Sequence, residues 1–180
     1  ARGQELPASV RNALCWLESL APPIIIVPTA CKGSALLTYV LNNVSDTDPN
    51  SRTPKLMRPT LLNGDRVVQY AWAFNEASSG AMEQANTISC AVRHIRCLGW
   101  GIDLAVGHGE VVDALPGPRA PRQQYRPIQT MTGSGSDLRV PTTGSLVSLE
   151  RDYAGYLKRH HTPGVATLES ASVLFETQQY

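Results

Sequence analysis

The chain has 180 residues, of which 42% are hydrophobic and 17% charged, an ordinary composition for a globular protein. Its length supports one domain, or one domain with a long insertion, and its longest apolar run, residues 24–27, is far too short to cross a membrane. The formal net charge of +1 argues by itself against a nucleic-acid partner, so such a partner requires a local concentration of charge.

The first predicted elements are a helix and two short strands. Residues 7–20 predict the helix, with Pro7 in its first turn and apolar side chains on one face. Residues 24–27 are β-branched and predict a buried strand, and residues 36–41 predict another. The pattern leaves open whether these are one bent strand or a pair. Residues 42–63 have no periodicity and contain three prolines, which predicts a long loop.

The middle of the chain predicts a strand, a helix and one or two further strands. Residues 67–74 alternate and carry aromatic side chains on one face, as in a strand. Residues 82–98 predict a helix, with Cys90 and Cys97 as buried or half-buried thiols. Residues 102–112 predict one or two strands around a glycine-rich turn.

The last third of the chain is richer in loops. Residues 115–135 are rich in proline, arginine and glycine and predict a loop, followed by a short extended piece at 138–141. Thr143 or Ser145 is suited to cap a helix near 144–160. The tail beyond this helix is weakly patterned.

This order of elements predicts an α+β fold. With one strand ahead of residue 1, it is the βαββαβ order of a ferredoxin-like (RRM-like) domain with a long inserted thumb loop and a C-terminal extension. We therefore expect a domain over residues 1–113, with its insertion at 42–66, and a loop-rich extension over 114–180. Because the first residue is Ala1, we also expect a chain that is processed, trimmed or only partly represented.

Cations gather locally despite the low net charge. Thirteen of the 16 cations are arginine, whose planar fork suits phosphate. Four of the 16 cations lie between residues 52 and 66, together with the single acid Asp65. Seven cations lie between residues 119 and 159. These clusters indicate a basic surface for nucleic acid, although solvated loops explain the charge alone equally well.

Metal and acid–base chemistry have little support in the residue pattern. The four cysteines form no CxxC pair, and no histidine has a partner at metal-ligand spacing, so we expect no metal and no cofactor. His108, between two glycines, is the one histidine in a plausible site context for general acid–base catalysis. No signal peptide is visible, and we expect a cytoplasmic protein.

Several motifs occur together in a recognisable order. They are LESLAPPIIIVP at 17–28, Thr38-Tyr39-Val40, Arg58-Pro59, VVQYAW at 67–72, the helix end at 93–99, and LRVPT at 138–142 before Gly144-Ser145-Leu146. In this order the chain resembles the Cas-five-like amino-terminal half of the fused Cas-five/Cas-six subunit of type I-G (formerly I-U) CRISPR Cascade. Most of residues 8–158 share the resemblance. The strand before residue 1 and the entire Cas-six-like half, where ribonuclease activity is expected to reside, are not in this sequence.

A glycine pattern adds to the resemblance. Gly99-Trp100-Gly101 and Gly107-His108-Gly109 are similar to the glycine-rich loop of repeat-associated RNA-binding CRISPR proteins, where glycines let the backbone approach a phosphate. The residues alone leave open a simpler reason, because Gly99 also stands where a helix would end.

The resemblance implies a non-catalytic subunit that holds the 5′ handle of the guide crRNA and caps the backbone filament. Its implied partners are the crRNA, the Cascade backbone subunit and the large subunit, with target DNA only through the assembled complex and no membrane. The residues expected to contact RNA are Lys55, Arg58, Arg66, Gly99, Trp100, Gly101, His108 and Arg139. Two alternatives stay open: a Cas-five-like metal-independent ribonuclease that uses His108, and a protein-interaction scaffold without RNA contact.

Overall fold

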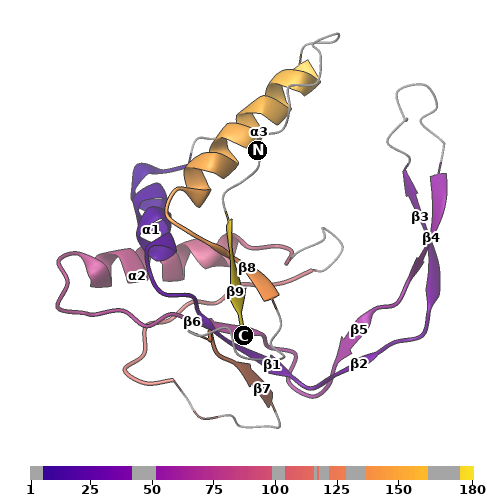
Figure 1. Ribbon diagram of the computed structural model, residues 1–180, viewed down its shortest axis with the longest axis horizontal. Helices are drawn as coiled ribbons and strands as arrows, with labels where there is room; N and C mark the ends of the chain where they lie inside the picture. The colour runs from indigo at the N-terminus through magenta and orange to yellow at the C-terminus, as the bar shows by residue number, and fades with distance from the viewer. Residues whose placement is uncertain are drawn as a thin grey trace. The chain divides into compact units, whose positions relative to one another are not determined.

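The computed structural model describes residues 6–41, 52–98, 104–115, 117, 122–128, 137–161 and 175–180. The described residues form both helices and short strands, with a run of strands between α1 and α2, which confirms the expected α+β fold class (Figure 1). The chain divides into two compact units. Unit 1 comprises Ala1–Ile24, Ala71–Pro116 and Tyr125–Tyr180, and unit 2 comprises Ile25–Tyr70 and Gly117–Gln124.

Two helices pack against each other in unit 1. Helix α1, Ala8–Glu18, begins directly after Pro7, whose missing N–H costs nothing where helical donors lack partners. Helix α2, Ala81–Ala91, begins after Gly80, which has a left-handed φ of 77° that a glycine adopts without strain. The buried residues of the two helices are small: Ala13, Ala81 and Ala85. Small side chains at these positions let the helices approach closely.

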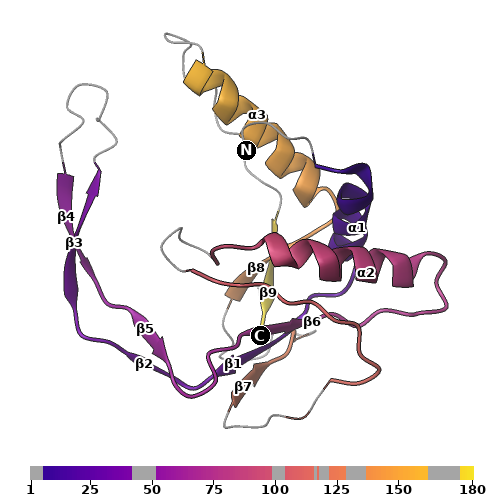
Figure 2. The ribbon, with the colours of Figure 1, turned by 180° about the vertical axis from the view of Figure 1, so that it is seen from behind.

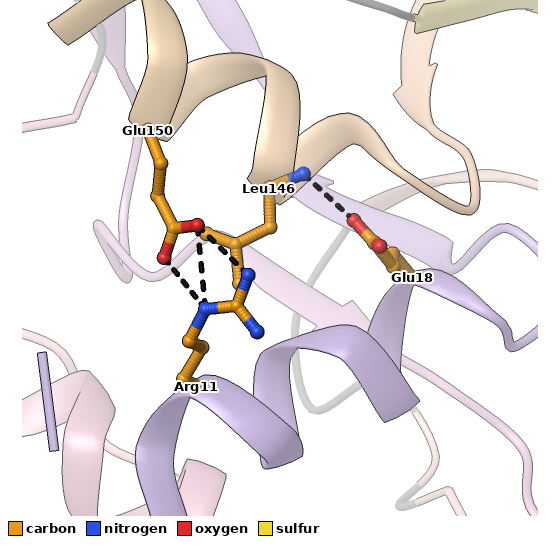
Figure 3. Close-up of polar contacts among 4 residues, drawn as sticks. All are labelled: Arg11, Glu18, Leu146 and Glu150. Atoms are coloured by element: carbon orange, nitrogen blue, oxygen red, sulfur yellow. Dashed lines mark hydrogen bonds and ion pairs between the residues drawn. The ribbon is translucent and has the colours of Figure 1, made fainter. Parts of the chain in front are cut away.

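The third helix, α3, Ser145–His161, is held against α1 by polar contacts (Figure 3). Arg11 donates from Nε and Nη2 to the carboxylate of Glu150 at 2.9 Å each. At the other end of α1, the carboxylate of Glu18 accepts the backbone N–H of Gly144 at 2.8 Å and of Leu146 at 2.9 Å. A side chain of α1 therefore caps the start of α3.

Unit 1 also contains a two-stranded antiparallel sheet. Strand β8, Asp137–Pro141, pairs with β9, Phe175–Gln179, and Val140 and Tyr180 are buried there. The backbone N–H of Ile128 donates to the carbonyl of Gln179 at 2.8 Å, so the strand pair is also tied to the segment that follows β7.

Strand β1, Ile24–Pro28, is the middle strand of a three-stranded sheet. Its neighbours are β6, Gln69–Ala71, and β7, Arg122–Tyr125. Beyond β1 the chain forms two successive antiparallel pairs that run along one arm (Figures 1 and 2). The first pairs β2, Ala30–Lys32, with β5, Thr60–Leu62, and the second pairs β3, Leu36–Leu41, with β4, Arg52–Met57.

The insertion expected as a loop is therefore a β-hairpin in its described part. Residues 52–57 and 60–62 are strands, and the sequence hid them because β4 contains Pro54 and does not alternate. A proline is tolerated here because each strand of a two-stranded pair has one open edge. Pro54 lies opposite Tyr39 in the register. The strands at 24–28 and 36–41 are two separate strands and not one bent strand.

Helix α2 ends earlier than expected. It stops at Ala91, and a 3-10 turn at Val92–His94 follows. Cys90 and Cys97 are exposed, so the prediction of buried or half-buried thiols was wrong. The strands expected within 102–112 do not form in the described residues 104–112, apart from a single bridge between Cys97 and Leu104.

Three further strand predictions were incomplete or wrong. The strand expected at 67–74 forms only at Gln69–Ala71, which is β6. Phe74 lies outside this strand, and its ring packs edge to face on the ring of Trp16 with 5.4 Å between the ring centroids. The expected loop at 115–135 contains β7, and the weakly patterned tail contains β9. The extended piece at 138–141 and the helix near 144–160 are confirmed as β8 and α3. The ferredoxin-like arrangement stays a prediction.

Candidate nucleic-acid interface

The hairpin arm, defined as β2, β3, β4 and β5, has two faces along β3 and β4. Partners in an antiparallel register share a face, and successive residues alternate between faces. One face, the apolar face, carries Leu37 opposite Leu56 and Tyr39 opposite Pro54, and at its outer end Leu41 lies opposite Arg52. The opposite face, the lysine face, includes three cross-strand pairs: Leu36 with Met57, Thr38 with Lys55, and Val40 with Thr53.

The apolar face lies largely in solvent. The side chains of Leu37, Tyr39 and Leu56 are 56%, 62% and 65% exposed. On the lysine face, the hydroxyl of Thr38 donates to the backbone carbonyl of Lys55 at 3.0 Å, which adds a cross-strand contact beside the lysine. The strands of this arm are thus stabilised by their own ladder and present both faces outward.

Positive charge is concentrated in unit 2. Over its residue ranges the sequence contains seven cations and three acids, a net charge of +4, whereas unit 1 contains nine cations and twelve acids, a net charge of −3. Five cations of unit 2 are exposed in its described part: Lys32, Arg52, Lys55, Arg58 and Arg66. A separation of this kind produces a local positive potential that the chain's net charge conceals.

Arg122 is different from these exposed cations because it is used inside the fold. Its side chain is only 8% exposed; Nη2 contacts the carboxylate of Asp65, and Nη1 donates to the amide oxygen of Gln69 at 2.9 Å. The acid nearest the base of the hairpin arm is therefore paired with an internal arginine. Arg122 therefore ties β7 to the chain that leaves the arm.

The glycine-flanked histidine lies in unit 1, on a segment that is pressed against α2. A Cβ at Gly107 would come within 2.0 Å of the carbonyl oxygen of Val92, and a Cβ at Gly109 within 2.6 Å of the Cα of Ser89. Close packing on the helix thus explains both glycines without RNA. His108 points outward with a side chain 73% exposed, and its Nε2 lies 4.0 Å from Glu110.

A sequence model of the CRISPR-associated protein, GSU0054 family, matches residues 2–179. The chain belongs to this family. No curated protein and no solved structure matches it. Membership in the GSU0054 family supports a role in a CRISPR system and in antiviral defence, as the resemblance implied. It does not specify which subunit of a CRISPR complex the chain is.

The structure groups some of the expected RNA contacts of this GSU0054-family chain and separates others. Lys55 lies on β4, Arg58 in the link between β4 and β5, and Arg66 before β6, all exposed in unit 2. His108 and Arg139 belong to unit 1, where Arg139 is exposed on β8 opposite Thr177. Three expected contacts lie outside the described residues: Gly99, Trp100 and Gly101.

Sequence reasoning missed three features of the hairpin arm in this family member. Lys32 lies in β2, where no strand was predicted; Arg52 lies opposite Leu41 at the end of the arm; and Tyr39 is exposed on the same face as Arg52. The available signal was the largely apolar run at 36–41, since a strand that is apolar on both faces needs a partner to cover it. Within the described residues there is no cluster of three metal-ligand side chains and no helix long and apolar enough for a membrane.

Proposed function

We propose that this chain is a non-catalytic RNA-binding subunit of a CRISPR effector complex, and that its hairpin arm holds the guide RNA. The observation that carries the proposal is the net charge of +4 on unit 2, with exposed cations along the arm, in a chain whose remainder is negative. Phosphate contacts dominate the affinity of proteins for nucleic acid, so binding should depend on this unit and on salt.

The two faces of the arm suggest how RNA lies on it. Lys55 on the lysine face and Arg58 just beyond β4 supply charges for successive phosphates of a single strand. Arg52 and Tyr39 lie at the outer part of the arm, where a tyrosine ring offers a flat surface for a base. Shape and phosphate contacts, rather than base readout, are then the source of affinity.

The finer identity follows from the sequence resemblance and is part of the proposal. The chain acts as the Cas-five-like half of the type I-G Cascade subunit, binds the 5′ handle of the crRNA and caps the backbone filament. The backbone subunit is the proposed partner of the inner part of the apolar face, Leu37 and Leu56, since leucines cannot pair with phosphate. The large subunit and, through the assembled complex, target DNA are the further proposed partners.

The absence of catalysis is proposed on the surroundings of His108. Its imidazole is 73% exposed and lies 4.0 Å from Glu110, too far for a hydrogen bond that would orient it as a general acid or base. RNA contacts by Trp100, Gly101, His108 and Arg139 stay predictions.

Fluorescence anisotropy with a repeat-derived RNA and a scrambled RNA of equal length tests the proposal. The variant Lys55→Ala/Arg58→Ala is compared with Arg93→Ala/Arg96→Ala, which removes the same charge from exposed positions of unit 1. Each lost phosphate contact changes the slope of log Kobs against log salt by about 0.7 for a single strand, so the arm variant should have a slope shallower by about 1.4.

The control variant should bind as the wild-type chain does, and a denaturing gel should show intact RNA in every case. Equal weakening by the two double variants, or no binding even at low salt, would exclude the arm as a stand-alone RNA clamp. Cleavage that His108→Ala abolishes would replace the proposal with the ribonuclease alternative.

A further inference from the structure

The segment of residues 104–112 has the alternation of a β-strand, but among the described residues no strand lies beside most of its length. Residues 105, 107, 109 and 111 are partly buried, whereas 104, 106, 108, 110 and 112 are exposed, the period of two of an extended chain. Leu104 and Val106 are 86% and 88% exposed, the highest values among the large hydrophobic side chains of the described residues. In Figures 1 and 2 the segment runs along α2.

Glycines fix this segment on the helix. A Cβ at Gly107 would collide with the carbonyl of Val92, in the 3-10 turn after α2, and a Cβ at Gly109 with the Cα of Ser89 in α2, so the segment lies directly against both. Its outward row of side chains and the direction of its backbone groups are therefore set in advance. Preorganisation of this kind lowers the entropy lost when a partner binds.

Within the described part of the chain, the backbone of this segment is paired at its start and not beyond it. Cys97 and Leu104 form an isolated antiparallel bridge, and the N–H of Ala105 donates to the carbonyl of Arg96 at 3.0 Å. In the described part of the chain, no backbone hydrogen bond follows for residues 106–112. N–H groups alternate between the two edges of an extended chain, so those of residues 106, 108, 110 and 112 point away from the Arg96–Cys97 side.

We infer that this open edge of 104–112 binds an extended β-strand of a neighbouring protein chain. An edge with unpaired N–H and C=O groups is a template for strand addition, in which main-chain hydrogen bonds give affinity and alternate side chains give specificity. The added strand covers Leu104 and Val106 with apolar side chains at every second position. The inference is independent of the proposed RNA site, which lies on unit 2.

The charges of this segment indicate which side chains the added strand carries. Residues 104–115 contain two acids, Glu110 and Asp113, and no lysine or arginine. A cationic residue at the end of the added strand that lies beside Glu110 is therefore favoured, and an RNA backbone is disfavoured by repulsion. RNA also lacks the alternating donors and acceptors of a peptide ladder.

A peptide probe tests the inference by residue-resolved deuterium exchange on the 180-residue chain. The probe has nine residues, threonine alternating with valine and a lysine at each end, and the control peptide has proline in place of its central valine. The probe should slow exchange at Val106, His108, Glu110 and Val112 more than at the intervening positions. The control peptide should not, because proline cannot donate to the ladder.

Matched variants locate the effect on the protein. Val106→Pro removes one edge donor and should lose the protection, whereas Val106→Thr keeps the N–H and should retain it, with circular dichroism used to verify that both variants fold. Unchanged exchange at saturating probe, protection confined to other segments, or equal protection by the proline peptide would overturn the inference.

Discussion

The carboxylate of Glu18 acts as a helix cap supplied by a different helix. It accepts N–H groups at the first turn of α3, from Gly144 at 2.8 Å and Leu146 at 2.9 Å. These donors have no partner within α3, and the negative charge lies where the helix dipole favours an anion. Replacing Glu18 should therefore weaken both the start of α3 and its attachment to α1.

The magnitude follows from these two contributions. Loss of a capping side chain costs typically about 1 kcal/mol, and loss of an anion at a helix N-terminus costs roughly 0.3–1 kcal/mol. We expect Glu18→Ala to lower the free energy of unfolding by about 2 kcal/mol. For a chain of this size that corresponds to a Tm lower by about 4–8 °C. Glu18→Gln keeps one carbonyl acceptor without the charge and should lose about half as much.

Thermal unfolding followed by far-UV circular dichroism measures these values, and deuterium uptake of α3 shows where the change occurs. Glu76→Ala, at an exposed turn position before α2, is the matched control and should stay within about 0.5 kcal/mol of the wild-type chain. A Tm for Glu18→Ala equal to that of the control, or unchanged uptake in α3, would refute this reasoning.

Three further predictions follow from packing and charge. Gly107→Ala should destabilise the chain by about 1–3 kcal/mol through overpacking on α2, whereas Gly117→Ala, with open space around its Cβ, should be neutral or slightly stabilising in the same melts. Arg122→Met leaves the Gln69 amide oxygen without this donor and should cost about 1–3 kcal/mol in urea unfolding. The hydrogen bond from Arg11 lowers the pKa of the Glu150 carboxyl. The contribution of this pair to the free energy of unfolding should therefore be complete above about pH 5 and lost as the pH falls through the lowered pKa. Measurements of Tm across this pH range check the prediction.

Each of these predictions has an opposing result. Equal melting of the two glycine variants would mean that the 104–112 segment does not lie against α2. Unfolding of Arg122→Met at the wild-type urea midpoint would mean that the arginine does not hold the base of the hairpin arm. A Glu150→Gln variant should lose less stability than the wild-type chain between about pH 6 and pH 3, and parallel pH profiles would contradict the Arg11–Glu150 account.

Local patterns predicted the elements that carry their own signal. The helices α1 and α3 and the strands β1, β3 and β8 have clear apolar periodicity or β-branched runs, and each forms near the expected residues. Strands β4, β7 and β9 were missed because their stability comes from a partner distant in sequence. Residues 52–57 have no strand pattern alone, but a full six-residue register with β3 supports them.

The candidate site was predictable as charge and not as geometry. The cluster of cations at 52–66 was visible in the sequence, but its division into two faces requires the register of β3 with β4. The pattern around His108 illustrates the opposite case, since glycines suited to a phosphate are also glycines suited to close packing on a helix. Only the distances to Val92 and Ser89 show the packing role.

The most direct test of the central claim is to map where RNA touches the chain. A repeat-derived RNA substituted with 4-thiouridine is crosslinked to the 180-residue chain by ultraviolet light, and the crosslinked peptides are identified by mass spectrometry. The account predicts crosslinks within residues 30–41 and 52–66, on the basic hairpin arm and the segment after it. Crosslinks confined to α1, α2 and α3, with none on the arm, would contradict it.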